Sequence, residues 1–233
     1  VPEVYGGMGL GYVELVAMME QMGRYLLCSP FFSTVCLAGN ALRVAGSEEQ
    51  QARWLGQLCE GNLTATLAFN GGSSRWDADA ITATWRREGE DYVLNGDYRY
   101  VIDGHSCGLL IVAAREEGST GQDGISLFLI SADAEGLEHR TYPTIDGSRG
   151  CDLFLNNVKL GPDALLGEEG KAAEVIEYQA GRAISALCGE AVGAMEVACD
   201  LTLEYLKQRK QFGVPIGKFQ VLQHRMVDMM SEL

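Results

Sequence analysis

All the strand-like segments of this sequence lie together in the middle of the chain, and this grouping is what most constrains the fold. Residues 63–69 alternate with the period of two that is typical of a strand. Asn95-Gly96, further along, predicts a type I′ hairpin turn between two such runs. Strands that follow one another without intervening helices predict a β-sandwich or small barrel, not a doubly wound dinucleotide fold. The other strand-like runs are residues 81–86, 92–94, 98–102, 109–114, 125–130 and 151–158.

Helical periodicity occupies both sides of this block. Apolar residues recur at helical spacing from Tyr12, and a second helix is predicted over residues 31–44. Ser47-Glu48-Glu49-Gln50 is a capping box, in which the Ser47 hydroxyl and the Gln50 amide each bond the other residue's main-chain N–H. It opens a third helix, which we expect to bury Trp54, Leu55 and Leu58.

Towards the C-terminus, the pattern predicts a long helix that ends at Gln208 and another that begins at Phe219. The long helix carries small residues that allow close approach of a neighbouring helix. We therefore predict an α+β fold with an incomplete N-terminal helical domain (1–61), a middle β-domain (62–165) and the start of a C-terminal helical bundle (166–233). The small residues are Ala180, Gly181, Ala186, Gly189, Gly193 and Ala194.

Composition narrows the class of function. The formal net charge is −14, which argues against nucleic acid as a partner because phosphate neutralisation needs a basic face. No apolar run approaches the length of a membrane span, and no signal peptide is evident. The seven cysteines are scattered without zinc spacing, so we interpret them as small core residues in a reducing cytoplasm. Because the chain begins at Val1-Pro2 and stops within a periodic helix, we expect a fragment of a longer polypeptide.

The basic residues gather near the C-terminus, where Tyr205–Arg225 holds five of the chain's 18. Gly and Pro at residues 213–217 cannot continue a helix, so two helices with a tight loop between them are predicted. This loop brings Arg209, Gln211 and Phe212 near Phe219 and Gln220. A guanidinium fork, amides and aromatic rings in one corner suit a ligand with phosphate and a ring. The alternative is a solvated basic helix end that complements the helix dipole.

Three stretches carry a resemblance to a known family. They are PEVYGGMGLGYVELVAMMEQMGR (Pro2–Arg24), DYVLNGDYRYVIDG (Asp91–Gly104) and RKQFGVPIGKFQVLQHRMVDM, which begins at Arg209. In this order they resemble the acyl-CoA dehydrogenase family of flavoproteins. Within it, ALCGEAVGAME (Ala186–Glu196) is similar to the small subunit of pimeloyl-CoA dehydrogenase-type enzymes.

The resemblance implies a mechanism and a cofactor site. Family members hold FAD between the β-domain and the C-terminal helices, at a subunit interface, while a Glu removes the α-proton of an acyl-CoA and a hydride passes to the flavin. Arg209 and Gln211 match positions at the FAD diphosphate and adenosine half. Phe212 matches an aromatic beside the cofactor, and Phe219 with Gln220 matches a second contact pair. The structural alternative for Arg209 is a salt bridge to a helix carboxylate such as Glu204.

The middle domain departs from the family pattern in two places. The family's W-[IV]-[ST] element, whose hydroxyl faces the flavin ring, is Tyr100-Val101-Ile102 here, so only the main-chain N–H at Ile102 is left to donate. The segment expected to line flavin and substrate contains Ser73, Ser74 and Arg75, which either face the coenzyme or cap a loop.

The general base is not identified. In a minority of the family it lies at the position that matches Ala183, which is not a carboxylate, so we expect the base outside this fragment and do not assign the role to Glu190. No metal site is predicted, because His105, His139 and His224 lie in different blocks.

Three hypotheses follow. The first is an FAD-dependent acyl-CoA dehydrogenase of fatty acid metabolism and β-oxidation, a tetramer that reduces an electron-transfer flavoprotein or similar acceptor. The second is a non-catalytic subunit that contributes FAD contacts to a hetero-oligomer built as a dimer of dimers. The third is a non-redox scaffold of the same fold that binds acyl-CoA or a partner.

Overall fold

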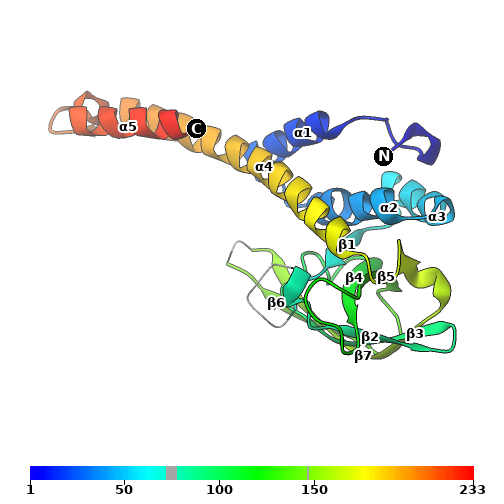
Figure 1. Ribbon diagram of the computed structural model, residues 1–233. Coiled ribbons are helices and arrows are strands. Elements are labelled where there is room, and N and C mark those ends of the chain that lie inside the picture. The colour runs from blue at the N-terminus through cyan, green and yellow to red at the C-terminus, as the bar shows by residue number, and fades with distance from the viewer. Residues whose placement is uncertain (72–77, 146) are drawn as a thin grey trace. The chain divides into compact units, whose positions relative to one another are not determined.

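The strands of the middle block form one eight-stranded sheet in the described part of the chain, which comprises residues 1–71, 78–145 and 147–233 of a computed structural model (Figure 1). The strand order is β6-β7-β3-β2-β4-β5-β8, and β1 pairs in parallel with β4. The strands are β1 (Ala65–Ala68), β2 (Thr84–Glu88), β3 (Asp91–Tyr98), β4 (Leu109–Glu116), β5 (Ile125–Ser131), β6 (Leu137–Pro143), β7 (Arg149–Leu160) and β8 (Leu165–Leu166).

The chain divides into two compact units. Unit 1 comprises residues 1–10 and 29–183, and unit 2 comprises residues 11–28 and 184–233. Unit 1 holds the sheet, and its helices α2 (Asn40–Ala45) and α3 (Glu48–Cys59) lie on one side of it (Figure 1). Unit 2 holds α1 (Tyr12–Arg24), α5 (Gln220–Glu232) and the greater part of α4 (Ala173–Gln208).

Strand β4 separates two apolar cores in unit 1. Its side chains at Leu109 and Ile111 join the core under the helices, whereas those at Leu110 and Val112 join the core on the opposite side of the strand. Both faces are buried, which explains why the run LLIVAA contains no polar residue. The second core centres on three aromatic rings, Trp85, Tyr92 and Phe128, whose centroids lie 5.0–6.0 Å apart in edge-to-face geometry.

The predicted hairpin turn at Asn95-Gly96 is wrong. Both residues lie inside β3, at an irregularity in its pairing with β7, and residues 99–102 are not a strand. The Asn95 side chain is used within the sheet, where its Oδ1 accepts the N–H of Asn157 at 2.8 Å. Gly96 is required there because a Cβ would lie 2.5 Å from Ala83 Cα. The turn between β2 and β3 is instead at Gly89, whose φ is 69°.

Strand β1 confirms the predicted strand, and its side chains alternate between the two cores, with Ala65 and Leu67 in one and Ala68 in the other. All four of its residues are therefore buried. Strand β6 has no apolar alternation in its sequence, and most of its side chains are exposed, so the pattern gave no sign of it.

The predicted helices of unit 1 are present, with one change of type. Residues 31–44 are helical, but Phe32–Gly39 is a π-helix that continues into α2. Gln179 on α4 donates from Nε2 to the Leu37 carbonyl of this π-helix at 2.8 Å. The capping box is confirmed, with Gln50 N–H bonded to Ser47 Oγ at 3.2 Å and the reciprocal bond at 3.1 Å. Leu55 is fully buried, and Trp54 and Leu58 are partly buried against the same core.

Glycines bring α1 and α4 into close contact in unit 2. A Cβ on Gly193 would lie 1.8 Å from the carbonyl oxygen of Glu20, and one on Gly23 would lie 1.9 Å from that of Glu190. Arg24 adds an ion pair with Glu196 across the contact. The prediction that small residues on the long helix admit a neighbouring helix is therefore confirmed.

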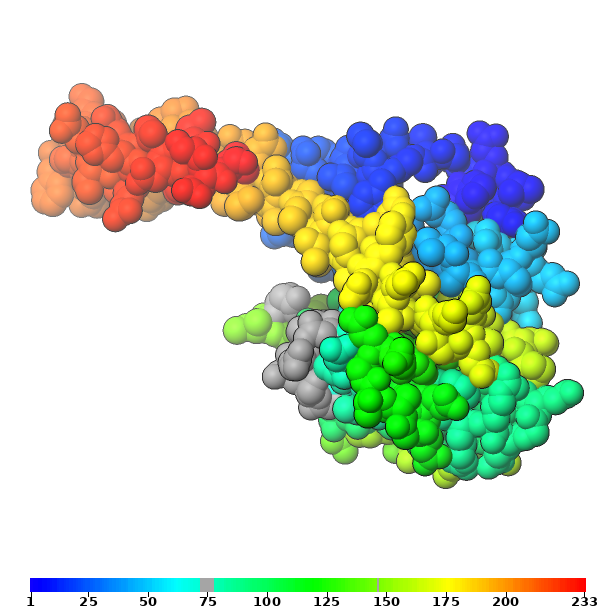
Figure 2. Space-filling model, viewed as in Figure 1, coloured from blue at the N-terminus to red at the C-terminus, as the bar shows by residue number. Residues whose placement is uncertain are grey.

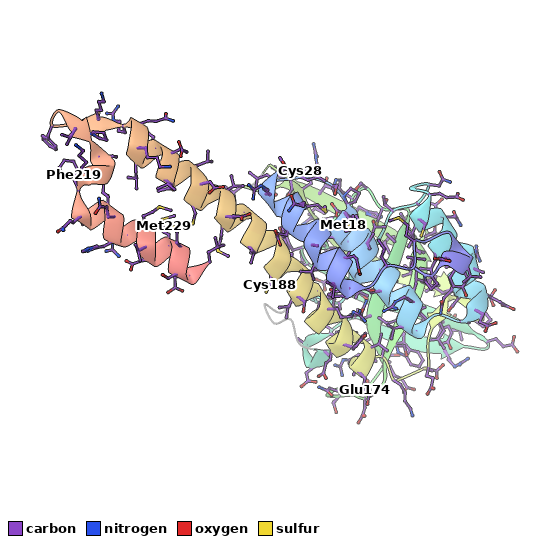
Figure 3. All side chains as sticks on the ribbon, turned by 90° about the horizontal axis from the view of Figure 1, so that it is seen from above. Met18, Cys28, Glu174, Cys188, Phe219 and Met229 are labelled. Atoms are coloured by element: carbon purple, nitrogen blue, oxygen red, sulfur yellow. The ribbon has the colours of Figure 1, made fainter. Side chains whose placement is uncertain are left out.

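None of the seven cysteines, all of which lie among the described residues, forms a disulfide. Their interpretation as core residues holds for Cys36, Cys107, Cys151 and Cys199, which are buried. It is wrong for Cys28, Cys59 and Cys188, which are exposed; Cys28 and Cys188 are labelled in Figure 3. Within the described ranges, no helix is both long and apolar enough to cross a membrane.

Candidate functional site

The basic corner of unit 2 is a small hairpin between two helices. Helix α4 ends at Gln208, and the short strands β9 (Lys210–Gln211) and β10 (Val214–Pro215) pair before α5 begins. The turn between them consists of Phe212 and Gly213, with φ of 52° and 80°. Positive φ at both central residues is what a type I′ turn requires, so the predicted tight loop is a β-hairpin.

Phe212 is the most unusual residue of this corner. Its side chain is 91% exposed, and its left-handed backbone costs about 1–2 kcal/mol in a residue other than glycine. The ring lies edge-on to that of Phe219, with centroids 6.2 Å apart, so the two predicted aromatic positions do meet. Phe219 is labelled in Figure 3, at the hairpin end of α5. A strained backbone that presents an aromatic ring to solvent is typical of a binding position.

Arg209 lies at the base of the hairpin with its guanidinium unpaired among the residues that the structure describes. Its main chain is fixed, because its N–H bonds the Tyr205 carbonyl and its carbonyl accepts the N–H of Ile216, both at 2.8 Å. The alternative of a salt bridge to Glu204 is wrong, because Glu204 pairs with Lys207 at 2.7 Å. The corner therefore offers an anion a cation whose main chain is held in place and whose guanidinium has no partner in the described part of the chain.

The side-chain amides of two glutamines in this corner can also contact a ligand. Gln211 and Gln220 are exposed, and within the described ranges neither side chain makes a hydrogen bond. Side-chain amides can donate to phosphate or ribose oxygens.

In unit 2, α5 runs beside the end of α4 (Figures 1 and 2). Residues of both helices and of the hairpin line an apolar groove of about 450 Å³. Its walls are mainly aliphatic and methionine side chains, and Lys207 and Lys218 also line it. The apolar lining is Leu203, Leu206, Pro215, Met226, Val227 and Met230.

The second predicted cofactor segment, Tyr100-Val101-Ile102, lies in unit 1 directly after β3. Three successive N–H groups are already committed there: Arg99 donates to the Asn70 carbonyl at 2.9 Å, Tyr100 to Asp152 Oδ1 at 3.1 Å, and Val101 to the Cys151 carbonyl at 2.7 Å. The N–H of Ile102 has no acceptor among the described residues. Among the described residues it is therefore the one main-chain donor of residues 100–102 that is not already bonded.

Asp152 is a functional candidate that the sequence did not suggest. It is 8% exposed, and besides the Tyr100 N–H it accepts the Tyr142 hydroxyl at 3.1 Å and Arg99 Nη1 at 2.9 Å. Burial raises the pKa of this carboxyl, but the three hydrogen bonds outweigh burial and hold the pKa below its usual value. The available signal was a charged residue between the apolar residues Cys151 and Leu153 of a strand.

The remaining predicted residues are not brought into either site. Ser73, Ser74 and Arg75 lie outside the described residues. Ala183 is buried on α4. His139 contacts the carbonyl oxygens of Gly104 and Ala132 at 3.1 Å, and no group of three or more metal-ligating side chains occurs in the ranges that the structure covers.

The fold belongs to a known class of helical–β–helical enzymes. Butyryl-CoA dehydrogenase from Megasphaera elsdenii superimposes with a TM-score of 0.91 at 26% identity, over 99% of this chain and 62% of that one. An acyl-CoA dehydrogenase from Geobacillus kaustophilus gives 0.92 at 26% identity, over 100% of this chain and 63% of that one. The predicted α+β class is confirmed by both superpositions.

Sequence comparison names the family. Models of the N-terminal, middle and C-terminal domains of acyl-CoA dehydrogenase match residues 1–62, 70–158 and 174–233 in that order. Mitochondrial isovaleryl-CoA dehydrogenase of Oryza sativa subsp. japonica is 32% identical over 100% of this chain and 58% of its own length. A 3-(aryl)acrylate reductase of Clostridium sporogenes is 30% identical over 100% of this chain and 63% of its own length. The chain belongs to the acyl-CoA dehydrogenase family, and it spans about 60% of the length of these relatives.

Proposed function

We propose that this chain is part of an FAD-dependent acyl-CoA dehydrogenase that introduces an α,β double bond into an acyl-CoA thioester. The observation that carries this proposal is the hairpin corner, where Arg209 has no ion-pair partner among the described residues and Phe212 combines an exposed ring with a strained backbone. An unpaired cation in a chain of net charge −14 is well suited to the diphosphate of a dinucleotide.

The residues present fit FAD. Arg209 and Gln211 would bind the diphosphate and adenosine half, Phe212 and Phe219 would contact its rings, and Gln220 would add a polar contact. When bound, the flavin accepts the hydride from the β-carbon. In unit 1, the N–H of Ile102, which has no acceptor among the residues that the structure describes, would donate to the flavin ring, and the exposed Tyr100 side chain would contact it.

The substrate side of the proposal rests on the family. An acyl-CoA is the substrate class, and we propose that the general base is a carboxylate outside these residues, because Ala183 cannot act as one. One similar solved structure is described as an electron transferring flavoprotein of Acidaminococcus fermentans (TM-score 0.91, 27% identity), which supports such a protein as electron acceptor. We further propose a dimer-of-dimers assembly, and a reducing compartment such as the cytoplasm because none of the seven described cysteines forms a disulfide.

Visible absorbance of the purified full-length protein tests the cofactor. We expect a flavin spectrum with one FAD per chain, and loss of most bound FAD in Arg209→Gln, with a smaller loss in Arg209→Lys, which keeps the charge but not the fork. The matched control is Lys207→Gln, which removes a neighbouring charge that is already paired with Glu204. Equal FAD content in the Arg209 and Lys207 variants would count against the corner as the FAD site.

A second candidate is the non-catalytic subunit of a heteromeric acyl-CoA dehydrogenase. It is favoured by the absence of a side-chain donor at Ile102 and by the resemblance of Ala186–Glu196 to the small subunit of pimeloyl-CoA dehydrogenase-type enzymes. A protein that is colourless alone but binds FAD after co-expression with a partner would support this reading. If it binds no flavin with any partner, the non-redox scaffold is the better description.

A further inference from the structure

Asp152 is a buried carboxylate whose contacts converge on one short segment. Its Oδ1 accepts the N–H of Tyr100 and the hydroxyl of Tyr142, and its Oδ2 accepts Arg99 Nη1. A paired charge in a protein interior is seldom more stabilising than a well-packed apolar side chain. Stability alone therefore does not explain a carboxylate at residue 152. Its hydrogen bonds to Tyr100 and Arg99 indicate instead that it holds the segment after β3 in place.

The residue that Asp152 holds is strained. Tyr100 has a φ of 51°, which costs about 1–2 kcal/mol in a residue other than glycine, and the residue is 42% exposed. Such a conformation persists only where surrounding contacts fix it. The Asp152 bond to the Tyr100 N–H supplies one contact, and the Val101 N–H bond to the Cys151 carbonyl supplies the next.

These two bonds determine which donor of the segment stays free. With the N–H groups of residues 99, 100 and 101 committed to Asn70, Asp152 and Cys151, the N–H of Ile102 is left without an acceptor in the described part of the chain. The Ile102 side chain has no polar atom, so this N–H is its sole donor.

We propose that Asp152 is a positioning residue for the flavin: it fixes Tyr100 so that the main-chain N–H of Ile102 is presented to the flavin ring. The inference rests on the proposed function, because it presumes that flavin binds at this segment. It deepens that function by naming the carboxylate that compensates for the missing side-chain donor.

Asp97 provides a matched control. Its Oδ2 accepts Arg99 Nε at 2.9 Å, so it pairs with the same guanidinium as Asp152, but no bond joins it to residues 100–102 in the described part of the chain. Replacing either carboxylate removes one negative charge beside Arg99. Only the change at Asp152 releases the Tyr100 N–H.

The test uses the full-length protein with Asp152→Ala, Asp152→Asn and Asp97→Ala. FAD affinity is measured by titration, and amide hydrogen exchange is measured in flavin-free protein.

We expect Asp152→Ala to weaken FAD binding by about tenfold, as for loss of one hydrogen bond to a charged group. Asp152→Asn, which keeps an oxygen acceptor, should lose less, and Asp97→Ala should change affinity by less than about twofold. Exchange should rise at the Tyr100 and Val101 amides in the two Asp152 variants, less in Asp152→Asn, while β7 stays protected.

Each outcome decides a different point. Equal losses in Asp152→Ala and Asp97→Ala, or faster exchange across the whole of β6 and β7, would reduce Asp152 to a structural residue and overturn the inference. If Asp152→Ala does not fold, Asp152→Asn against Asp97→Asn decides by the same two readouts. A wild-type protein that binds no FAD with any partner overturns the proposed function and this inference with it. Wild-type FAD binding that survives unchanged in the Asp152 variants overturns the inference alone.

Discussion

Arg115 on β4 is a buried cation that has no carboxylate partner among the described residues. Its guanidinium is bonded instead to four main-chain carbonyls, those of Ile81 at 2.7 Å, Gly121 at 2.9 Å, Ser119 at 3.2 Å and Asp79 at 3.3 Å. These carbonyls belong to two separate loops, so one side chain fixes both against the sheet. A planar guanidinium with five N–H donors can bond carbonyls of both segments at once, whereas the single ammonium group of a lysine cannot.

We therefore expect Arg115→Lys to lower the free energy of unfolding by about 3 kcal/mol, because a buried charge and several carbonyls lose their partners. Urea unfolding of the full-length protein measures the loss. The matched control is Arg86→Lys on the neighbouring strand, where an exposed ion pair with Glu88 predicts a change below about 0.5 kcal/mol. Similar midpoints for the two variants would contradict this account of Arg115.

Two carboxyls of unit 1 make stability depend on pH in the acid range. The pKa of Asp152 is lowered as described, and that of Glu169 is also lowered: burial raises it, but the hydroxyl of Tyr92 and the guanidinium of Arg87 outweigh burial. A carboxyl whose pKa is lowered on folding adds stability above its unfolded pKa and loses it as the pH falls through its folded pKa.

Unfolding free energy should therefore be level near neutral pH and fall once the pH drops below about 4, the ordinary carboxyl pKa. Thermal melts of wild type and Glu169→Gln between neutral pH and pH 3 measure the slope. The variant should be less stable than wild type at pH 7 and converge with it at low pH. A difference that stays constant across this range would refute the assignment.

At the scale of elements, the α1–α4 contact of unit 2 depends on helix backbones approaching through glycine. Gly193→Ala places a Cβ 1.8 Å from the Glu20 carbonyl oxygen, so the helices must move apart. We expect a loss of about 2 kcal/mol, the usual cost of overpacking. Gly181→Ala on the same helix meets nothing within 4 Å and should instead add about 0.5–1 kcal/mol through helix propensity. Far-UV circular dichroism during urea unfolding compares the two, and a stabilising Gly193→Ala would show that the contact is looser than described.

The hairpin corner allows strain to be separated from binding. Phe212→Gly removes the ring and the cost of positive φ, whereas Phe212→Ala removes the ring alone. Both variants should weaken FAD binding, but only the glycine variant should melt at a higher temperature than wild type, by the equivalent of about 1 kcal/mol. FAD titration and calorimetry measure the two quantities. Unchanged FAD affinity in both variants would remove Phe212 from the site.

Sequence patterns predicted those elements whose partners are local. The capping box at Ser47, the two helices around the hairpin and the meeting of Phe212 with Phe219 all depend on residues close in sequence. Asn95-Gly96 was misassigned because Asn95 bonds Asn157 on another strand, and such long-range partners leave no local pattern. Asp152 was missed for the same reason: its role comes from Tyr100 and Tyr142, which only the folded sheet brings to it.

At the scale of the whole chain, the two units differ in how much apolar surface they bury. Unit 1 contains both large cores, whereas the buried apolar side chains of unit 2 are Met19, Ala186, Cys199 and Met226. Elements with few buried contacts open more readily. In the 233-residue chain, we expect amides of α5 to exchange much faster than those of β4 in hydrogen-exchange mass spectrometry. Equal protection would mean that unit 2 is stabilised by more than its own packing.

The exposed thiols of Cys28, Cys59 and Cys188 have a practical consequence for the question of assembly. In air, such groups on separate molecules oxidise to intermolecular disulfides, and a covalent dimer formed on storage would run on a sizing column like a native one. Sedimentation or light scattering that is meant to distinguish a homo-oligomer from a hetero-oligomer therefore needs fresh reductant throughout. A dimer band that disappears on a reducing gel reflects oxidation during storage and not the native assembly of the protein.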